Sequence, residues 1–254
     1  MPSAASDDLA YSLDPVLWAK EVLGYHPDPW QADLLRSRSR KIILNCSRQS
    51  GKSTTCAALG LHESIYRRPS FGLVVAPTQD QSSELMLKFD EFRGAVELPS
   101  DYLSTDTKLA VRFANGNRFI ARPGSEKSAR SFSAVTLLLE DEASRVLDDL
   151  YNSVRPMLAV SNGRHILMST PFGKRGHFFK IWSEERDLWE WFEIPAEKCP
   201  RITPEFLAEE MRTNPWYEQE YHCKFMETED QVFSNETIRM LFDTPVEPLW
   251  SDSI

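Results

Sequence analysis

The sequence lacks several features that would place the protein in a specialised class. It has no apolar run long enough to cross a membrane, and its mean hydropathy is −0.41. The first ten residues contain no basic region followed by an apolar stretch, so no secretion signal is predicted. These absences favour a cytoplasmic protein with no membrane partner.

Cysteine is scarce. The 254 residues include four cysteines and five histidines, and no two cysteines form a CxxC pair. A zinc site or a redox pair would need a closer spacing of these residue types. We therefore expect reduced, buried thiols at Cys46, Cys56, Cys199 and Cys223.

Positive charge is in the minority. The chain has 29 basic and 38 acidic residues, which gives a net charge of −9. A protein that coats nucleic acid without specificity is usually basic overall, so the composition argues against that class. A local basic lane on an acidic body remains compatible with a DNA partner.

Short apolar segments alternate with segments of helical pattern along most of the chain. Strands are predicted at 41–45, 73–76, 135–139 and 166–168, and a hairpin at 109–113 and 118–121 around Asn115-Gly116-Asn117. Helices are predicted at 16–22, 30–36, 52–66 and 80–92, the first capped by Asp14 and the last by Thr78. Continuous apolar strands between helices predict an α/β fold, with a mainly parallel central sheet flanked by helices.

The two ends of the chain differ from this central part. Residues 1–13 are small and acidic and predict a flexible tail, so the α/β domain is expected to span 14–195. Beyond it, prolines and acidic residues accompany helical patterns at 204–211, 215–221 and 236–242. We therefore expect residues 196–254 to form a small helical linker or lid.

The run Ser47-Arg48-Gln49-Ser50-Gly51-Lys52-Ser53-Thr54 lies between the strand at 41–45 and the helix at 52–66. This order is typical of a P-loop, in which backbone N–H groups hold phosphate oxygens. Lys52 is expected to reach the β- and γ-phosphates of ATP, and the Ser53 hydroxyl to bind Mg²⁺. Cys46 stands where the motif usually has its first glycine, so the run alone is also compatible with a chance match.

A second motif, Leu137-Leu138-Leu139-Glu140-Asp141-Glu142, is an apolar strand that ends in three acids. Ligands of open α/β sheets bind at the carboxyl ends of such strands. Asp141 is expected to hold Mg²⁺ through water, and Glu142 to orient and deprotonate the attacking water. Glu140 is unexpected in a buried strand and could exchange roles with Asp141. A purely structural cluster is disfavoured, because three adjacent carboxylates repel one another without a cation.

Three further features are candidates for nucleotide contacts. Arg48 acting in cis, or Arg130 acting in trans on a neighbouring subunit, could stabilise the charge of the transition state, and the sequence does not choose between them. Ser169 and Thr170 follow a strand and could sense the γ-phosphate, or form a plain turn before proline. The Gln31 amide could pair with adenine, or face solvent.

The order of these motifs is more specific than any one of them. Over residues 25–245 the chain resembles the N-terminal ATPase domain of the large terminase subunit of tailed bacteriophages. The matching segments are Trp30-Gln31, Arg48-Gln49-Ser50-Gly51-Lys52-Ser53, Val75-Ala76-Pro77-Thr78, Phe113-Ala114-Asn115-Gly116, Arg130-Ser131-Phe132-Ser133-Ala134, Asp141-Glu142-Ala143-Ser144-Arg145-Val146, Ser169-Thr170-Pro171-Phe172-Gly173, Glu220-Tyr221, Phe225 and Val232-Phe233.

The resemblance implies an ASCE-type P-loop ATPase that drives double-stranded DNA into a procapsid. Such proteins work in the host cell cytoplasm as a homo-oligomeric ring, usually a pentamer, on the portal protein, together with a small terminase subunit. ATP and Mg²⁺ are the implied cofactors. The family often lacks the first P-loop glycine, which makes Cys46 less surprising.

The resemblance also implies roles by position. Lys52 and Ser53 bind nucleotide and Mg²⁺, Asp141 is the metal-side acid, and Glu142 is catalytic. Its coupling motif matches Ser169-Thr170, its adenine contact matches Gln31, and its trans-acting arginine matches Arg130.

Members of the family continue into an RNase H-like nuclease domain. Because this chain ends at Ile254, we expect a truncated form with motor and linker only. A helicase-type P-loop DNA translocase is the alternative, but it needs a second RecA-like half of about 150 residues. An inactive P-loop module that only binds nucleotide is disfavoured by the intact lysine, serine and acids of the two motifs.

Overall fold

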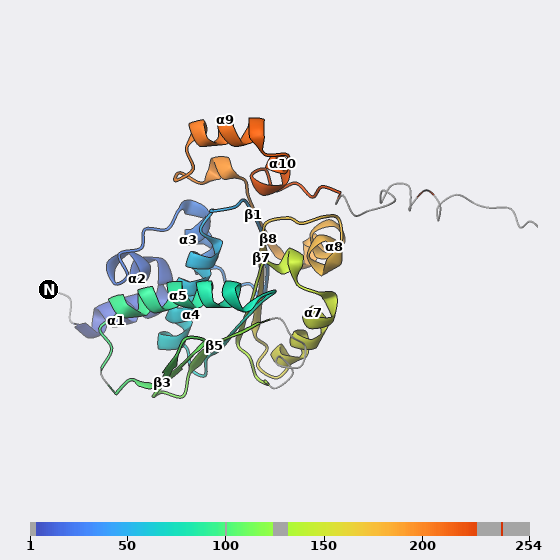
Figure 1. The fold of residues 1–254 in the computed structure, drawn as a ribbon. Helices are drawn as coiled ribbons and strands as arrows, with labels where there is room; N and C mark the ends of the chain where they lie inside the picture. The colour runs from blue at the N-terminus through green and yellow to red at the C-terminus, as the bar shows by residue number, and fades with distance from the viewer. Residues whose placement is uncertain (1–3, 100, 124–131, 228–239, 241–254) are drawn as a thin grey trace, which may run out of the picture.

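The computed structural model describes residues 4–99, 101–123, 132–227 and 240, and its centre is one eight-stranded sheet (Figure 1). The strand order is β3-β4-β5-β2-β6-β7-β1-β8. The strands are β1 (Lys41–Cys46), β2 (Phe71–Ala76), β3 (Leu103–Thr107), β4 (Ala110–Phe113), β5 (Arg118–Pro123), β6 (Leu137–Asp141), β7 (Arg164–Ser169) and β8 (Glu190–Ile194). All neighbours from β5 to β8 are parallel, whereas β3–β4 and β4–β5 are antiparallel. The predicted α/β fold is confirmed.

Helices cover both faces of the sheet (Figure 1). One face carries α1 (Ala4–Leu13), α2 (Pro15–Glu21), α3 (Pro29–Arg36), α4 (Lys52–Tyr66) and α5 (Gln79–Ala95). The other face carries α7 (Asp148–Val154) and α8 (Gly176–Glu184). Beyond one end of the sheet lie α9 (Pro204–Thr213) and α10 (Tyr217–Glu220).

Two-sided burial explains why the central strands are apolar without alternation. In β1, Ile42 and Leu44 pack in the core cluster that also contains residues of α4, whereas Ile43 packs with residues of α8. In β6, Leu137 and Leu139 belong to the α4 side, and Leu138 belongs to the opposite side. Successive side chains of a strand point to opposite faces, so each face needs its own apolar residues. The same alternation determines the faces to which Glu140 and Asp141 point.

The predicted caps and turn are present. The Asp14 side chain accepts a hydrogen bond from the Val16 backbone N–H at 3.0 Å and starts α2. Thr78 and Gln81 form a reciprocal capping box at the start of α5. Gly116, with φ of 87°, occupies the turn between β4 and β5, which confirms the hairpin.

The prediction of a flexible tail over 1–13 is wrong for residues 4–13, which form α1. Tyr11 packs against the main core cluster, its hydroxyl donates to Glu21 at 2.9 Å, and its carbonyl oxygen lies 2.9 Å from Nε2 of His62. One partly buried aromatic ring and these hydrogen bonds anchor a segment whose small and acidic residues predicted no structure. The sequence analysis also missed the two edge strands β3 and β8 and the two helices α7 and α8.

The carboxyl-terminal region is partly as predicted. Thr203 caps α9, and α10 is shorter than the helix predicted at 215–221. The helix predicted at 236–242 lies outside the described residues except for Met240, and the lid boundary at residue 196 stays a prediction. All four cysteines are buried and free, as expected. Within the described ranges, no helix has both the length and the apolar character that a membrane span needs.

Candidate functional site

The predicted P-loop joins the end of β1 to the start of α4. Its backbone enters the left-handed region at Gln49 and at Gly51, with φ of 57° and 91°. No side chain caps the start of α4, so the first backbone N–H groups of the helix are left for another acceptor. A phosphate group is the ligand that such a helix start and its dipole favour.

The inner side of the loop is formed by buried residues, namely Ser47, Ser50 and Lys52. Its outer side is formed by exposed or half-exposed residues, namely Arg48, Gln49, Ser53 and Thr54. The loop therefore presents lysine, hydroxyl groups and backbone N–H groups around one small region.

Two side chains from distant segments hold the loop in place. The Ser50 carbonyl oxygen accepts hydrogen bonds from Gln31 Nε2 at 3.2 Å and from Arg201 Nη2 at 3.0 Å. A Cβ atom on Gly51 would lie 2.7 Å from Gln31 Nε2, which is closer than such contacts allow. Gln31 is 1% exposed, and its oxygen accepts from the Asp28 backbone N–H at 2.8 Å. Gln31 thus stabilises the P-loop through its hydrogen bond to the Ser50 carbonyl oxygen. Its contact with adenine stays a prediction.

The acidic end of β6 meets the P-loop as predicted. Lys52 Nζ lies 2.9 Å from Glu142 Oε1, and the Ser53 hydroxyl donates to Asp141 Oδ2 at 3.2 Å. Glu142 has left-handed backbone geometry, with φ of 50°, and its N–H donates to Asp141 Oδ1 at 3.0 Å. Backbone strain of this kind costs about 1–3 kcal/mol and tends to occur at functional sites. Two motifs that are 88 residues apart in the chain therefore form one site.

Charge and burial oppose each other in this site. Burial raises the pKa of Asp141 to about 6, although the Lys52 ammonium favours the ionised carboxyl. Burial alone disfavours a charged Lys52, yet the Glu142 and Asp141 carboxylates hold its pKa above the ordinary value. An added cation next to Asp141 would favour its ionised form.

The residues present fit a magnesium ion. Ser53 Oγ and Asp141 Oδ2 are hard oxygen ligands from two sides of the same gap. Mg²⁺ is usually bound by one or two such protein ligands, with phosphate oxygens and water in the other positions. Ser53 and Asp141 are therefore the residues that would hold Mg²⁺ together with the nucleotide.

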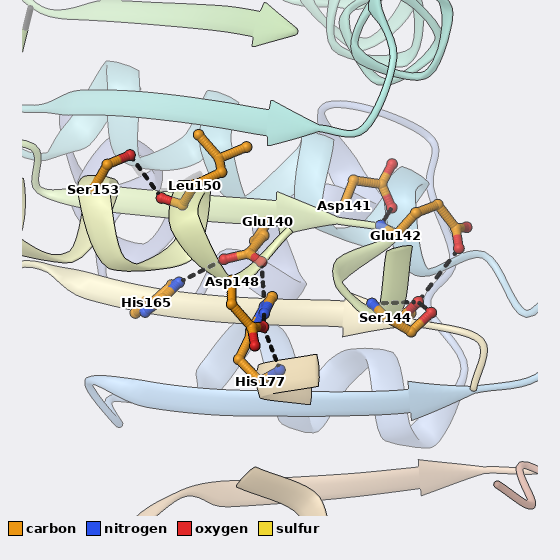
Figure 2. A network of polar contacts seen from close by, with 10 residues as sticks. Glu140, Asp141, Glu142, Ser144, Asp148, Leu150, Ser153, His165 and His177 are labelled. Atoms are coloured by element: carbon orange, nitrogen blue, oxygen red, sulfur yellow. Dashed lines mark hydrogen bonds and ion pairs between the residues drawn. The ribbon is translucent and has the colours of Figure 1, made fainter. Parts of the chain in front are cut away.

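Glu140 does not belong to this site. Figure 2 shows its carboxylate directed toward two histidines, away from the direction taken by Asp141. His177 Nε2 lies 2.5 Å from Glu140 Oε1, and His165 Nε2 lies 3.3 Å from Oε2. The alternative in which Glu140 and Asp141 exchange roles is thus wrong in this structure, since adjacent residues of a strand point to opposite faces. His177 also contacts Asp148 at the start of α7, through Nδ1 at 3.0 Å.

Of the two predicted arginines, the structure describes only Arg48. Arg48 is 61% exposed in its side chain and pairs with Glu220 Oε1 at 2.9 Å. Arg130 lies outside the described residues. The sequence analysis named Arg145 only within a motif and gave it no role. It lies three residues after Glu142 and shares a polar hollow of about 300 Å³ with Arg48, Lys52, Glu142 and other residues. Its guanidinium stacks on the Phe172 ring at 3.8 Å.

The predicted coupling residues contact the acidic loop. The Ser169 hydroxyl lies 2.7 Å from the Ser144 hydroxyl, 2.8 Å from the Thr170 carbonyl oxygen and 3.4 Å from Glu142 Oε2. The Ser144 hydroxyl donates to the same carbonyl at 2.8 Å, and Thr170 lines the hollow. Sequence reasoning placed Ser144 only within a motif, without a role.

Comparisons with known proteins identify the family of the chain. The chain matches the model of the family described as "Terminase large subunit, T4likevirus-type, N-terminal" over residues 43–240. The curated large terminase subunits of Thermus phage G20c and Thermus virus P23-45 are each 24% identical over 89% of this chain and 54% of their own length. The chain thus spans about half the length of these relatives.

Solved structures share the fold at low sequence identity. The large terminase ATPase domain of Thermus phage P74-26 superimposes with a TM-score of 0.71 at 21% identity, covering 82% of this chain and 97% of that chain. The large terminase of bacteriophage HK97 gives 0.68 at 14% identity, covering 84% and 55%. The large terminase of a thermophilic bacteriophage, in complex with ADP, gives 0.61 at 12% identity, covering 79% and 54%. The chain shares the fold of these large terminase domains, and it belongs to the family of large terminase subunits, whose N-terminal region it matches.

Proposed function

We propose that this chain hydrolyses ATP to ADP and phosphate, and that it uses the reaction to move double-stranded DNA into a viral procapsid. The observation that carries the proposal is the contact between the two motifs: Lys52 forms an ion pair with Glu142, and Ser53 donates a hydrogen bond to Asp141. One motif supplies phosphate-binding groups and the other supplies a metal-side acid and a base, which together are the parts that ATP hydrolysis needs.

The contacts suggest how the residues act. Lys52 holds Glu142 before nucleotide binds, and the β- and γ-phosphates compete for the same ammonium group. When Lys52 turns to the phosphates, Glu142 is free to accept a proton from water. That water oxygen bonds to the γ-phosphorus while the bond to the β–γ bridging oxygen breaks, which releases ADP and inorganic phosphate. Ser53 and Asp141 would hold Mg²⁺, which would supply neutralisation of phosphate charge.

Three roles around this step are part of the proposal. Arg48 in cis or Arg130 in trans stabilises the charge on the transferred phosphoryl group. Ser169 and Thr170 report the state of Glu142 to the rest of the domain, because the Ser169 hydroxyl lies 3.4 Å from Glu142 Oε2 and the Thr170 carbonyl oxygen accepts from the Ser144 hydroxyl. Gln31 contributes to the adenine pocket, in addition to its contact with the P-loop.

The partners follow from the relatives, which are named large terminase subunits. We propose double-stranded DNA, the portal protein of a procapsid and a small terminase subunit as partners. The working form is a homo-oligomeric ring, with five subunits as the expected number, in the host cell cytoplasm.

The decisive measurement is the ATPase rate of the chain with and without procapsid–portal complexes and double-stranded DNA. We expect slow turnover alone and faster turnover in the assembly. Glu142→Gln should bind ATP and lose turnover by about 10²–10⁴-fold, because a general base contributes that much. Glu184→Gln, an exposed carboxylate on α8, is the matched control and should keep the wild-type rate.

Two outcomes would contradict the proposal. Normal steady-state hydrolysis by Glu142→Gln would remove the assigned base. If the wild-type chain binds ATP but hydrolyses none under any condition, it is a nucleotide-binding module instead.

A second experiment separates the roles of the two arginines: Arg48→Ala and Arg130→Ala are each mixed with wild-type subunits. If an arginine acts in trans, the ATPase rate of the mixed assembly should fall with the fraction of subunit interfaces to which the variant contributes this position.

A further inference from the structure

A second polar hollow lies at the opposite end of the sheet from the P-loop. It has a volume of about 540 Å³ and is lined by polar and charged residues, among them Arg38, Arg40, Glu63, Arg67 and Arg164. We call it the arginine hollow. It lies where β1 and β7 begin and where α4 ends, because Arg40 precedes Lys41, Arg164 starts β7 and Arg67 follows Tyr66.

At the base of the hollow, the buried Arg164 side chain is held by hydrogen bonds. Arg164 is 9% exposed in its side chain, and its Nη1 donates to Glu63 Oε1 at 2.8 Å. Its Nε donates to the Ser39 carbonyl oxygen at 3.2 Å. Within the described residues, the buried Nη2 of Arg164 has no hydrogen-bond partner. A buried guanidinium nitrogen without a partner carries a desolvation penalty, so an acceptor in the hollow would be favourable.

Each rim arginine side chain has a polar contact. Arg40 Nη1 donates to the Asn162 side-chain oxygen, and Arg38 Nη2 reaches the Leu13 carbonyl oxygen at 3.4 Å. Arg67 lies 3.6 Å from Glu63 Oε2. These contacts are compatible with rim arginines that gather around one hollow.

The charge balance of the hollow is positive although the chain as a whole is at −9. Four arginines face one carboxylate, that of Glu63, which leaves a formal charge of +3. His62, also in the lining, adds no charge at neutral pH because burial lowers its pKa. The carbonyl groups at the end of α4 are partly neutralised, since Asn117 Nδ2 donates to those of Ser64 and Arg67 at 2.8 and 2.7 Å.

We propose that the arginine hollow binds a phosphate group. Planar guanidinium groups pair with phosphate oxygens through two parallel hydrogen bonds, and phosphate oxygens are acceptors only. The partnerless Nη2 of Arg164 at the base and the cations of Arg38, Arg40 and Arg67 at the rim fit that chemistry. A carboxylate-bearing ligand would use fewer of these donors.

The phosphate bound here is not that of the hydrolysed ATP. β1 runs from the hollow to the P-loop, and its six residues span roughly 20 Å at about 3.3 Å per residue. The ligand comes either from the backbone of DNA or from a free phosphate. Both sources have the same chemistry, and the experiment distinguishes them.

The test uses the Lys52→Ala chain, in which the P-loop has lost its phosphate-binding lysine. The first arm measures the Tm of the chain in inorganic phosphate against chloride at equal ionic strength. At ten times the Kd, phosphate should raise Tm by about 3–6 °C more than chloride does. The second arm measures binding of a labelled DNA duplex from 50 to 200 mM salt.

Both arms compare Arg38→Ala/Arg40→Ala with Arg155→Ala/Arg212→Ala, a control pair of exposed arginines outside the hollow. The hollow variant should lose the phosphate-specific rise in Tm, and the control should keep it. If DNA supplies the phosphate, the hollow variant should also lower the slope of log K against log[salt] by about 1–2. An unchanged slope with the loss of the Tm effect would assign the site to free phosphate.

Arg67→Ala, on a different element, gives the same readouts should the double variant not fold. The proposal is wrong if phosphate stabilises the Lys52→Ala chain no more than chloride and both double variants keep the same salt slope for DNA. It is also wrong if the control pair loses both effects as strongly as the hollow pair. Because neither arm contains ATP, these outcomes are independent of whether the chain hydrolyses ATP.

Discussion

Glu140 offers the sharpest test of the geometry, because a change there separates two readings of the acidic strand end. Glu140→Gln keeps the size of the side chain and removes its charge. The side chain is completely buried and contacts His177 and His165 through different oxygens. A glutamine amide can accept a hydrogen bond from only one of them and presents an NH₂ group to the other.

The size of the effect follows from these contacts. A hydrogen bond to a charged group contributes about 1.5–3 kcal/mol, so losing one of the two should lower the free energy of unfolding by roughly that amount. For a chain of this size about 2–4 °C of Tm corresponds to 1 kcal/mol, which predicts a decrease of about 3–12 °C. Glu140→Ala should cost more, about 3–5 kcal/mol, since it removes one partner of a buried ionic network.

The assay combines calorimetry with ATP turnover per folded molecule. Glu140→Gln should be less stable but should bind ATP, and its turnover should fall far less than that of Glu142→Gln. Glu142→Gln should lose far more turnover than Glu140→Gln, although the loss of its charge next to Lys52 should also lower Tm. If Glu140→Gln has wild-type Tm and abolishes turnover, then Glu140 faces the nucleotide and the assignment of Asp141 is refuted.

Further predictions concern the P-loop and the histidine network. Gly51→Ala should weaken ATP binding and cost about 1–2 kcal/mol of stability, because a Cβ atom is disfavoured at positive φ and meets Gln31; titration with a fluorescent ATP analogue and urea unfolding measure both effects. Lys52→Met should abolish the rise in Tm that ATP causes, because the phosphates lose their lysine, and an undiminished rise would contradict the P-loop assignment. For His177, burial lowers the pKa but Glu140 and Asp148 raise it by more, so its folded-state pKa lies above the unfolded value. Its contribution to stability should be complete below about pH 6.5 and lost as pH rises through the folded-state pKa; a His177→Gln chain should lack this loss in urea unfolding at a series of pH values.

The sequence predicted the elements whose signals are local. The strand at 41–45, the helix at 52–66 and the hairpin around Gly116 carry their own signals in apolar runs, glycine and asparagine. The P-loop and the acids at 141 and 142 could be joined because the ends of parallel strands meet at one edge. Arg145 and Arg201 could not be found in this way. Their roles depend on contacts with Phe172 and with the Ser50 carbonyl oxygen, which come from segments far away in the chain or in another loop.

The uncertainty over Glu140 has a physical origin in two-sided burial. A strand with one wet face shows its facing by alternation, but β6 is apolar at Leu137, Leu138 and Leu139 because helices cover both sides. Its sequence therefore carries no information on which face receives α4. That information is carried by α8, whose His177 provides a partner for a buried carboxylate on the far side. His177, in a helix on the opposite face, thus allows an acid at position 140. Because adjacent residues of a strand point to opposite faces, Asp141 then lies on the P-loop side, next to Ser53.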